Sequence, residues 1–170
     1  MRTRFFIGSF AAFFVVFALF GVQWSVNEGP LRNPEEALKD FYEAEDRAED
    51  QLIDPLILAG DRVVPLILKA LPNKDMQKRR YAISFLGNAG NFQALPILEK
   101  ILVDDTEEDY FRSDAFQAIY QISEIRAKEL APLYVSRSGK LGVVAKEILA
   151  DKSNCFFYRS YWDAFWHVHF

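Results

Sequence analysis

The stretch RRYAISFLGNAG, residues 79–90, has a related copy, RSDAFQAIYQIS, at residues 112–123. In both copies an arginine is followed after three positions by alanine, and after four more by leucine or isoleucine. The two alanines, Ala82 and Ala115, are 33 positions apart. A period of roughly 30 to 40 residues is typical of stacked helix pairs, because one pair alone cannot bury its apolar face. The repeat therefore predicts an all-α stack.

Each copy is interpreted as the second helix of a pair, because apolar residues around it recur at intervals of three and four. The first pair begins with an apolar helix at 63–71, and its second helix stops at Gly90. The second pair begins at 95–102 and turns through the acidic run 104–109, which we interpret as a solvated turn. A shorter third pair follows up to Leu149. The small residues Ala82, Ala115 and Ala145 are expected where helices cross closely. The prolines of the first helices are expected to bend them: Pro65, Pro96 and Pro132.

Residues 34–59 are predicted to form the first helices and to cap the stack. Asn33 before Pro34 has the composition of a helix start. A charged helix is expected from Glu35 to Gln51, and Gly60 is expected to end the helix that follows.

The first copy resembles the second helix of a HEAT repeat, whose phrase is Val-Arg-x-x-Ala-x-x-x-Leu-Gly-x-x-Gly. The matching residues are Arg79, Ala82, Leu86, Gly87 and Gly90, whereas the second copy has Tyr120 in place of the first glycine. The resemblance covers roughly residues 50–150. It is specific in the first pair and loose in the second and third pairs. It implies an α-solenoid of about three helix pairs that binds proteins through a curved surface. It also implies a ladder between repeats, for which the candidates are Asp75 with Arg79 and Asp109 with Arg112.

The N-terminus indicates a membrane segment. Residues 5–22 carry no charge and reach roughly 27 Å as a helix, close to the thickness of a bilayer core. Arg2 and Arg4 precede this run, which predicts that the C-terminal part is exported. We therefore expect a transmembrane anchor at 1–25, a linker at 26–33, a HEAT-like solenoid at 34–153 and an aromatic C-terminal segment at 154–170. If the first segment is a cleaved signal peptide instead, the protein is secreted.

The C-terminal segment holds eight Phe, Tyr or Trp residues between 156 and 170. One interpretation is a last helix that covers the open end of the stack. The other is contact with the membrane interface, where amphipathic aromatic rings are favoured. The residues expected at that interface are Trp24, Tyr161, Trp162 and Trp166.

Several chemistries find no support in the sequence. His167 and His169 do not share a helix face, so with Cys155 they make no metal site. The acidic run lacks the ligand spacing and central glycine of a calcium loop. Motifs for nucleophilic catalysis or phosphate binding are absent, and no cofactor is expected. The net charge of −4 disfavours nucleic acid as a partner.

The sequence therefore predicts a non-catalytic, membrane-anchored protein-binding or scaffolding module with a membrane-associated protein partner and a periplasmic or other extracytoplasmic location. Two alternatives remain on the same scaffold: a lyase-type or glycosylase enzyme, and a lipid-handling protein. The second helices are expected to line the concave surface. The binding residues predicted there are Arg80, Ser84, Asn88, Gln117, Gln121 and Glu124.

Overall fold

The computed structural model describes residues 33–45 and 51–152, and over these ranges the chain forms helices and no β-strand. The prediction of an all-α fold is confirmed for this part of the chain. Within the same ranges, no helix has the length and apolar character that crossing a membrane requires. The predicted anchor, the linker up to residue 32 and the aromatic segment 154–170 lie outside the described residues.

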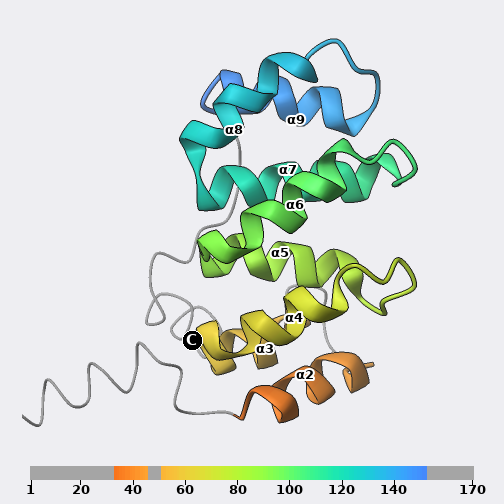
Figure 1. The fold of residues 1–170 in the computed structure, drawn as a ribbon, viewed down its shortest axis with the longest axis vertical. Helices are drawn as coiled ribbons and strands as arrows, with labels where there is room; N and C mark the ends of the chain where they lie inside the picture. The colour runs from red at the N-terminus through yellow and green to blue at the C-terminus, as the bar shows by residue number, and fades with distance from the viewer. Residues whose placement is uncertain (1–32, 46–50, 153–170) are drawn as a thin grey trace, which may run out of the picture.

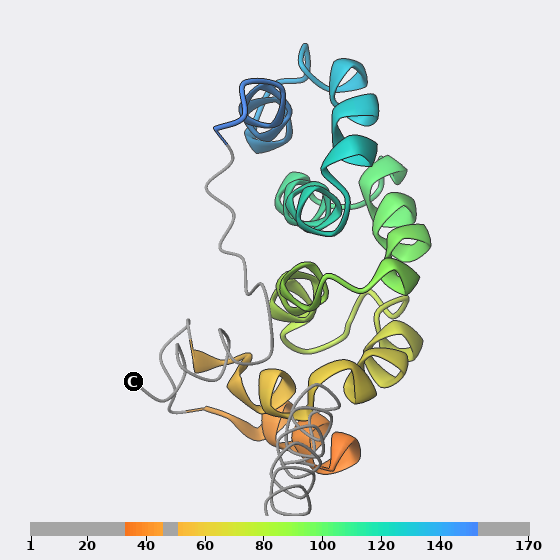
Figure 2. The same cartoon turned by 90° about the vertical axis from the view of Figure 1, so that its left-hand side faces the viewer.

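The helices are arranged in two layers (Figure 1, Figure 2). In chain order they are α2 (Pro34–Glu43), α3 (Asp54–Ala59), η2 (Gly60–Val63), α4 (Val64–Ala70), α5 (Arg79–Ala89), η3 (Phe92–Ala94), α6 (Leu95–Val103), α7 (Asp109–Ile122), α8 (Glu124–Leu130), η4 (Ala131–Leu133) and α9 (Lys140–Leu149). Helices α5, α7 and α9 lie side by side and form what we call the inner layer, on the concave side of the curved arrangement (Figure 2). Helices α4, α6 and α8 form the outer layer.

The first helix begins where the sequence predicts. The Asn33 side chain accepts hydrogen bonds from the backbone N–H groups of Glu35 and Glu36, at 2.9 and 3.2 Å. This is the geometry of an N-cap, which satisfies donors that a helix start leaves unpaired. The predicted stops at Gly60 and Gly90 are also confirmed, because both have positive φ angles, 62° and 64°.

The expectation of one helix from Glu35 to Gln51 is wrong, because α2 already ends at Glu43. The end of α2 is held by Lys78, whose ammonium group is a charge that a helix C-terminus favours. Lys78 itself has a left-handed backbone, with φ 55°. Its Nζ donates at 2.7, 3.1 and 2.5 Å to the carbonyl oxygens of Phe41, Tyr42 and Ala44.

The three prolines of the first helices do not bend them. Pro65 and Pro96 are each the second residue of an α-helix, after a short 3₁₀ turn. A proline there costs nothing, because that N–H has no partner within the helix. Pro132 lies in the 3₁₀ turn η4, after α8 has ended. The prolines therefore mark boundaries between helical segments.

The apolar core lies between the two layers and continues from one helix pair to the next. Helix α7 is central, because it packs against α5, α6, α8 and α9. Ala82 and Ala115, the residues of the repeated pattern, are fully buried. The largest fully buried side chains are Phe41, Phe116, Leu56, Ile67, Leu71, Ile83, Leu86, Leu98, Leu102, Ile119, Leu141 and Ile148.

Helices α5 and α7 approach each other closely at Gly87. A Cβ atom at Gly87 would lie 2.9 Å from the Cα atom of Ala118 and 1.9 Å from Oε1 of Gln121. Any side chain at this position would therefore push the two helices apart. Gly87 of the repeated stretch thus has a packing role in the inner layer.

Candidate functional site

The turns between paired helices, 71–78, 104–108 and 134–139, all lie along one side of the molecule, which we call the turn edge (Figure 1). One ion pair there joins Arg79, at the start of α5, to Glu107 of the next turn. Two parallel hydrogen bonds of 2.8 Å connect the guanidinium to the carboxylate, and the two side chains are only 3% and 5% exposed. The guanidinium carbon also lies 4.9 Å from the ring centroid of Phe111. This geometry is a buried bidentate ion pair between successive helix pairs.

The repeated arginines also connect the two helices of their own pair. Nε of Arg79 donates to the carbonyl oxygen of Leu71, and Nε of Arg112 donates to that of Leu102. Arg112 forms an ion pair with Asp105 at 2.7 Å. The predicted ladder partner Asp75 is exposed, and its backbone N–H donates to the Asn73 side chain.

A second set of contacts runs through Asp114, whose carboxylate lies between two cations. Nε of Arg80 is 2.5 Å from Oδ2, and Nζ of Lys140 is 2.7 Å from Oδ1. The Asp114 side chain is 9% exposed, whereas those of Arg80 and Lys140 are about half and 40% exposed. One acidic group of α7 therefore bridges α5 and α9.

Asp109, predicted as a ladder residue, contacts the next helix pair through its carboxylate. Oδ2 accepts hydrogen bonds from the backbone N–H groups of Lys140 and Leu141, at 2.7 and 3.3 Å. Gly139 precedes α9 and offers no side chain for capping, so Asp109 supplies the cap from another helix. A Cβ atom at Gly139 would lie 2.8 Å from this same oxygen.

The acidic run 104–109 is largely exposed, as the sequence predicts, but Asp104 and Glu107 are partly buried in it. Nζ of Lys74 lies 2.9 Å from Asp104 and 2.8 Å from Thr106, which links the first turn to the second. Hydrogen bonds from Thr106 and Lys74 hold the pKa of Asp104 well below its ordinary value. The hydrogen bonds from Arg79 likewise lower the pKa of Glu107. The charged forms of the two acids are favoured because Thr106 of the same turn, and Lys74 and Arg79 of the preceding helix pair, hydrogen-bond to them.

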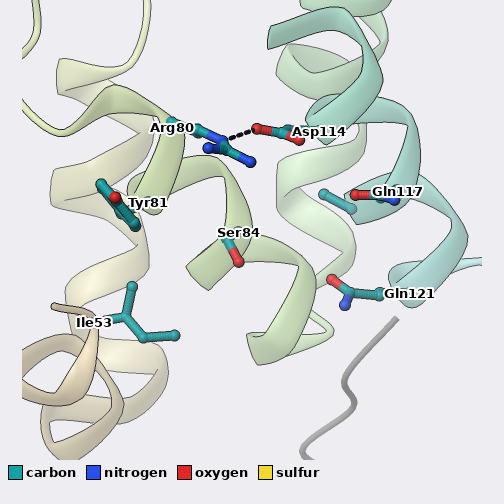
Figure 3. Close-up of a pocket in the computed structure, with 8 residues that line it drawn as sticks. Ile53, Arg80, Tyr81, Ser84, Asp114, Gln117 and Gln121 are labelled. Carbon is teal, nitrogen blue, oxygen red and sulfur yellow. Dashed lines mark hydrogen bonds and ion pairs between the residues drawn. The ribbon is translucent and has the colours of Figure 1, made fainter. Parts of the chain in front are cut away.

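A cavity of about 390 Å³ opens between α5 and α7 on the inner layer (Figure 3). Arg80, Tyr81 and Ser84 extend from α5, and Asp114, Gln117 and Gln121 from α7 (Figure 3). The full lining consists of Ile53, Arg80, Tyr81, Ser84, Asp114, Gln117, Ala118 and Gln121. The lining combines one ion pair with neutral hydroxyl and amide groups and an apolar wall.

Four of the six predicted binding residues come together in this cavity: Arg80, Ser84, Gln117 and Gln121. Asn88 is adjacent, since its side-chain oxygen accepts a 3.4 Å hydrogen bond from Gln121. Glu124 is not part of the cavity, because it begins the outer helix α8 and pairs with Lys128 at 2.7 Å. The predicted interface residues Trp24, Tyr161, Trp162 and Trp166 lie outside the described residues.

Sequence reasoning missed three lining side chains that matter for the chemistry: Ile53, Tyr81 and Asp114. Ile53 comes from the segment before α3, so only the folded chain places it here. Tyr81 lies on α5 directly after Arg80, and an aromatic residue in an apolar helix does not by itself indicate a binding site. Asp114 could have been noticed in the sequence, because it follows Arg112 of the repeated pattern by two positions. The structure shows that this position is buried, and a buried acid requires a cationic partner.

The cavity offers hydrogen-bond donors and acceptors together with one paired carboxylate. Within residues 33–45 and 51–152, no group of three His, Cys, Asp or Glu side chains is placed to hold a metal ion. The one carboxylate of the cavity is engaged by Arg80 and Lys140. No family model, curated protein or solved structure matches the chain. The geometry of the cavity is therefore the basis for a functional assignment.

Proposed function

We propose that this protein is a HEAT-like α-solenoid that binds another protein through its concave inner layer and has no catalytic activity. The observation that carries the proposal is the cavity between α5 and α7, where hydroxyl and amide side chains lie beside the ion pair of Arg80 with Asp114. Such groups both donate and accept hydrogen bonds, so they suit the backbone and polar side chains of a polypeptide.

The repeated contacts support the solenoid part of the proposal. Arg79 and Arg112 bond to the carbonyl oxygens of their own first helices in the same way. Acidic groups of the second pair then contact positive groups of the first and third pairs. Each pair thus interacts mainly with its neighbours, as in repeat proteins.

We further propose that the apolar segment at 5–22 anchors the protein in a membrane and that the helical part is exported. The proposal rests on the charge-free run and on Arg2 and Arg4 before it. A single exposed cysteine tests it: Lys100→Cys in a Cys155→Ser background, probed in intact cells with a membrane-impermeant maleimide. Export predicts labelling before lysis, and labelling only after lysis contradicts it.

Site-specific photocrosslinking tests the binding proposal on the full-length protein in its native membranes. A photoreactive residue at Ser84 reports on the cavity, and the same residue at Lys100, exposed on the outer helix α6, is the matched control. We expect discrete protein adducts from position 84 that position 100 does not give. Identical adduct patterns from both positions, or adducts with lipid alone at position 84, would contradict the proposal.

A further inference from the structure

The cavity between α5 and α7 defines the kind of segment that it can accept. Ile53 and Ala118 provide apolar surface, while Ser84, Gln117 and Gln121 provide neutral polar groups. The only charged side chains of the lining are Arg80 and Asp114, which form an ion pair, while Lys140, which is not part of the lining, contacts the same carboxylate. A suitable occupant is therefore a segment of low charge whose side chains are apolar with a polar tip.

Residues 153–170 of the same chain have this composition. The segment contains one arginine and one aspartate, so its formal net charge is zero with neutral histidines. Between 156 and 170 it has eight Phe, Tyr or Trp residues. The Tyr hydroxyl and Trp indole N–H need hydrogen-bond partners when the rings are covered, and side-chain amides supply them.

The point where this segment leaves the stack puts the cavity within its reach. Helix α9 ends at Leu149, and Lys128 holds the following Asp151 at 2.5 Å. The cavity lies between the other two helices of the same layer, one and a half helix spacings from α9, which is about 12–15 Å when neighbouring helices are 8–10 Å apart. Eighteen residues span up to roughly 60 Å when extended. The segment is therefore long enough to reach the cavity without any change in the arrangement of the helices.

We propose that residues 153–170 dock in the cavity between α5 and α7 of their own chain and occupy the surface that binds a partner. The consequence for partner binding rests on the function proposed above, whereas the docking itself does not. A tethered segment has an effective concentration on the order of millimolar, so a weak contact suffices to occupy the site. A protein partner must then displace the segment, which makes the C-terminus an autoinhibitory element.

The exposed end of the stack is a poorer place for this segment. Val143 and Leu149 on α9 are 51% and 46% exposed, but they are aliphatic. The nearby exposed side chains Lys140 and Lys146 donate hydrogen bonds and cannot accept them. Glu147 is the one acidic side chain of α9, so acceptors for an indole N–H or phenol O–H are fewer here than in the cavity, where Ser84, Gln117 and Gln121 lie together.

Tryptophan fluorescence provides a direct test, because all three tryptophans lie outside residues 33–152. Trp24→Phe in the full-length protein leaves only Trp162 and Trp166, so emission reports on the C-terminal segment alone. The quantity to measure is quenching by acrylamide, in a fixed detergent. Ser84→Arg and Gln117→Arg fill the cavity from α5 and α7, and Val143→Arg is the matched control at the end of the stack.

Docking predicts that both cavity variants increase the quenching constant at least about twofold, because covered indoles become exposed, and that Val143→Arg does not. Circular dichroism shows whether each variant keeps its helical content, and two substitutions on different helices guard against local misfolding. Equal quenching in all proteins overturns the proposal, and so does an increase only in Val143→Arg. These results need no partner, so they are independent of the crosslinking outcome.

Discussion

Helix α7 makes two contacts in the inner layer, and the two are built differently. Toward α5 it has a close helix approach at Gly87, and the buried pair of Arg79 with Glu107 lies at the other end of α5. Toward α9 it has the half-exposed Lys140 on Asp114 and the Asp109 carboxylate at the first N–H groups of α9. Buried pairs and close packing are sensitive to substitution, whereas exposed pairs contribute little. We infer that the α5–α7 contact dominates stability and that α9 is held more weakly.

The largest predicted effect comes from breaking the buried pair. Glu107→Ala leaves Arg79 buried without its carboxylate, which costs about 3–5 kcal/mol of unfolding free energy. Glu108→Ala removes the adjacent exposed acid and is the control. Urea unfolding followed by circular dichroism measures both. A loss below about 1 kcal/mol for Glu107→Ala would show that the pair contributes no more than a surface pair.

Acid titration sharpens the same comparison. Because the folded pKa of Glu107 lies below its ordinary value of 4.5, its contribution is fully present above pH 4.5 and is lost as the pH falls through the lowered value. The unmodified protein should therefore lose more stability below pH 4.5 than Glu107→Ala does. The measurement is the urea midpoint against pH, and parallel curves for the two proteins would contradict it.

The sequence predicted the fold better than the contacts that hold it. The 33-residue spacing and the pattern of apolar residues were sufficient to place the helix pairs, because these depend on local periodicity. The end of α2 at Glu43 was missed, because it depends on Lys78, which is distant in the sequence. The role of Glu107 was missed for the same reason, since its partner belongs to the preceding pair.

A smaller loss of unfolding free energy is expected from Gly87→Ala. The added methyl group would meet the backbone of Ala118 at 2.9 Å, and overpacking of this kind costs typically about 1–3 kcal/mol. Ser84→Ala, one turn earlier on the exposed side of α5, is the control and should change little. If Gly87→Ala is as stable as the parent in urea, the two helices can separate without cost, and the close approach is not a determinant of stability.

The candidate site was predictable in part. Placing the second helices on the concave side was sufficient to bring four predicted residues into one cavity, because side chains one turn apart share a helix face. Glu124 lies outside the cavity, because α8 begins directly after α7 and turns into the outer layer. Asp114 was missed because its two cations come from different helix pairs.

The contact to α9 predicts a local effect. Asp109→Ala removes the cap of α9, at a cost of about 1 kcal/mol, while Asp109→Asn keeps an acceptor and should cost less. Amide hydrogen exchange should increase in α9 and stay unchanged in α5. An equal increase in both helices would mean that the stack unfolds as one unit and that its two contacts are not separable.

The smallest loss of stability is expected when one of the two cations that contact Asp114 is removed. Lys140→Ala and Arg80→Ala each remove one half-exposed cation, and each should cost less than about 1 kcal/mol, because solvent and salt screen exposed pairs. The double substitution should cost more than the sum of the two, since it leaves the nearly buried carboxylate with neither cation. A double-mutant cycle at low and high salt measures this difference. Strict additivity would show that Asp114 does not couple α5 to α9, and the two contacts of α7 would then be independent.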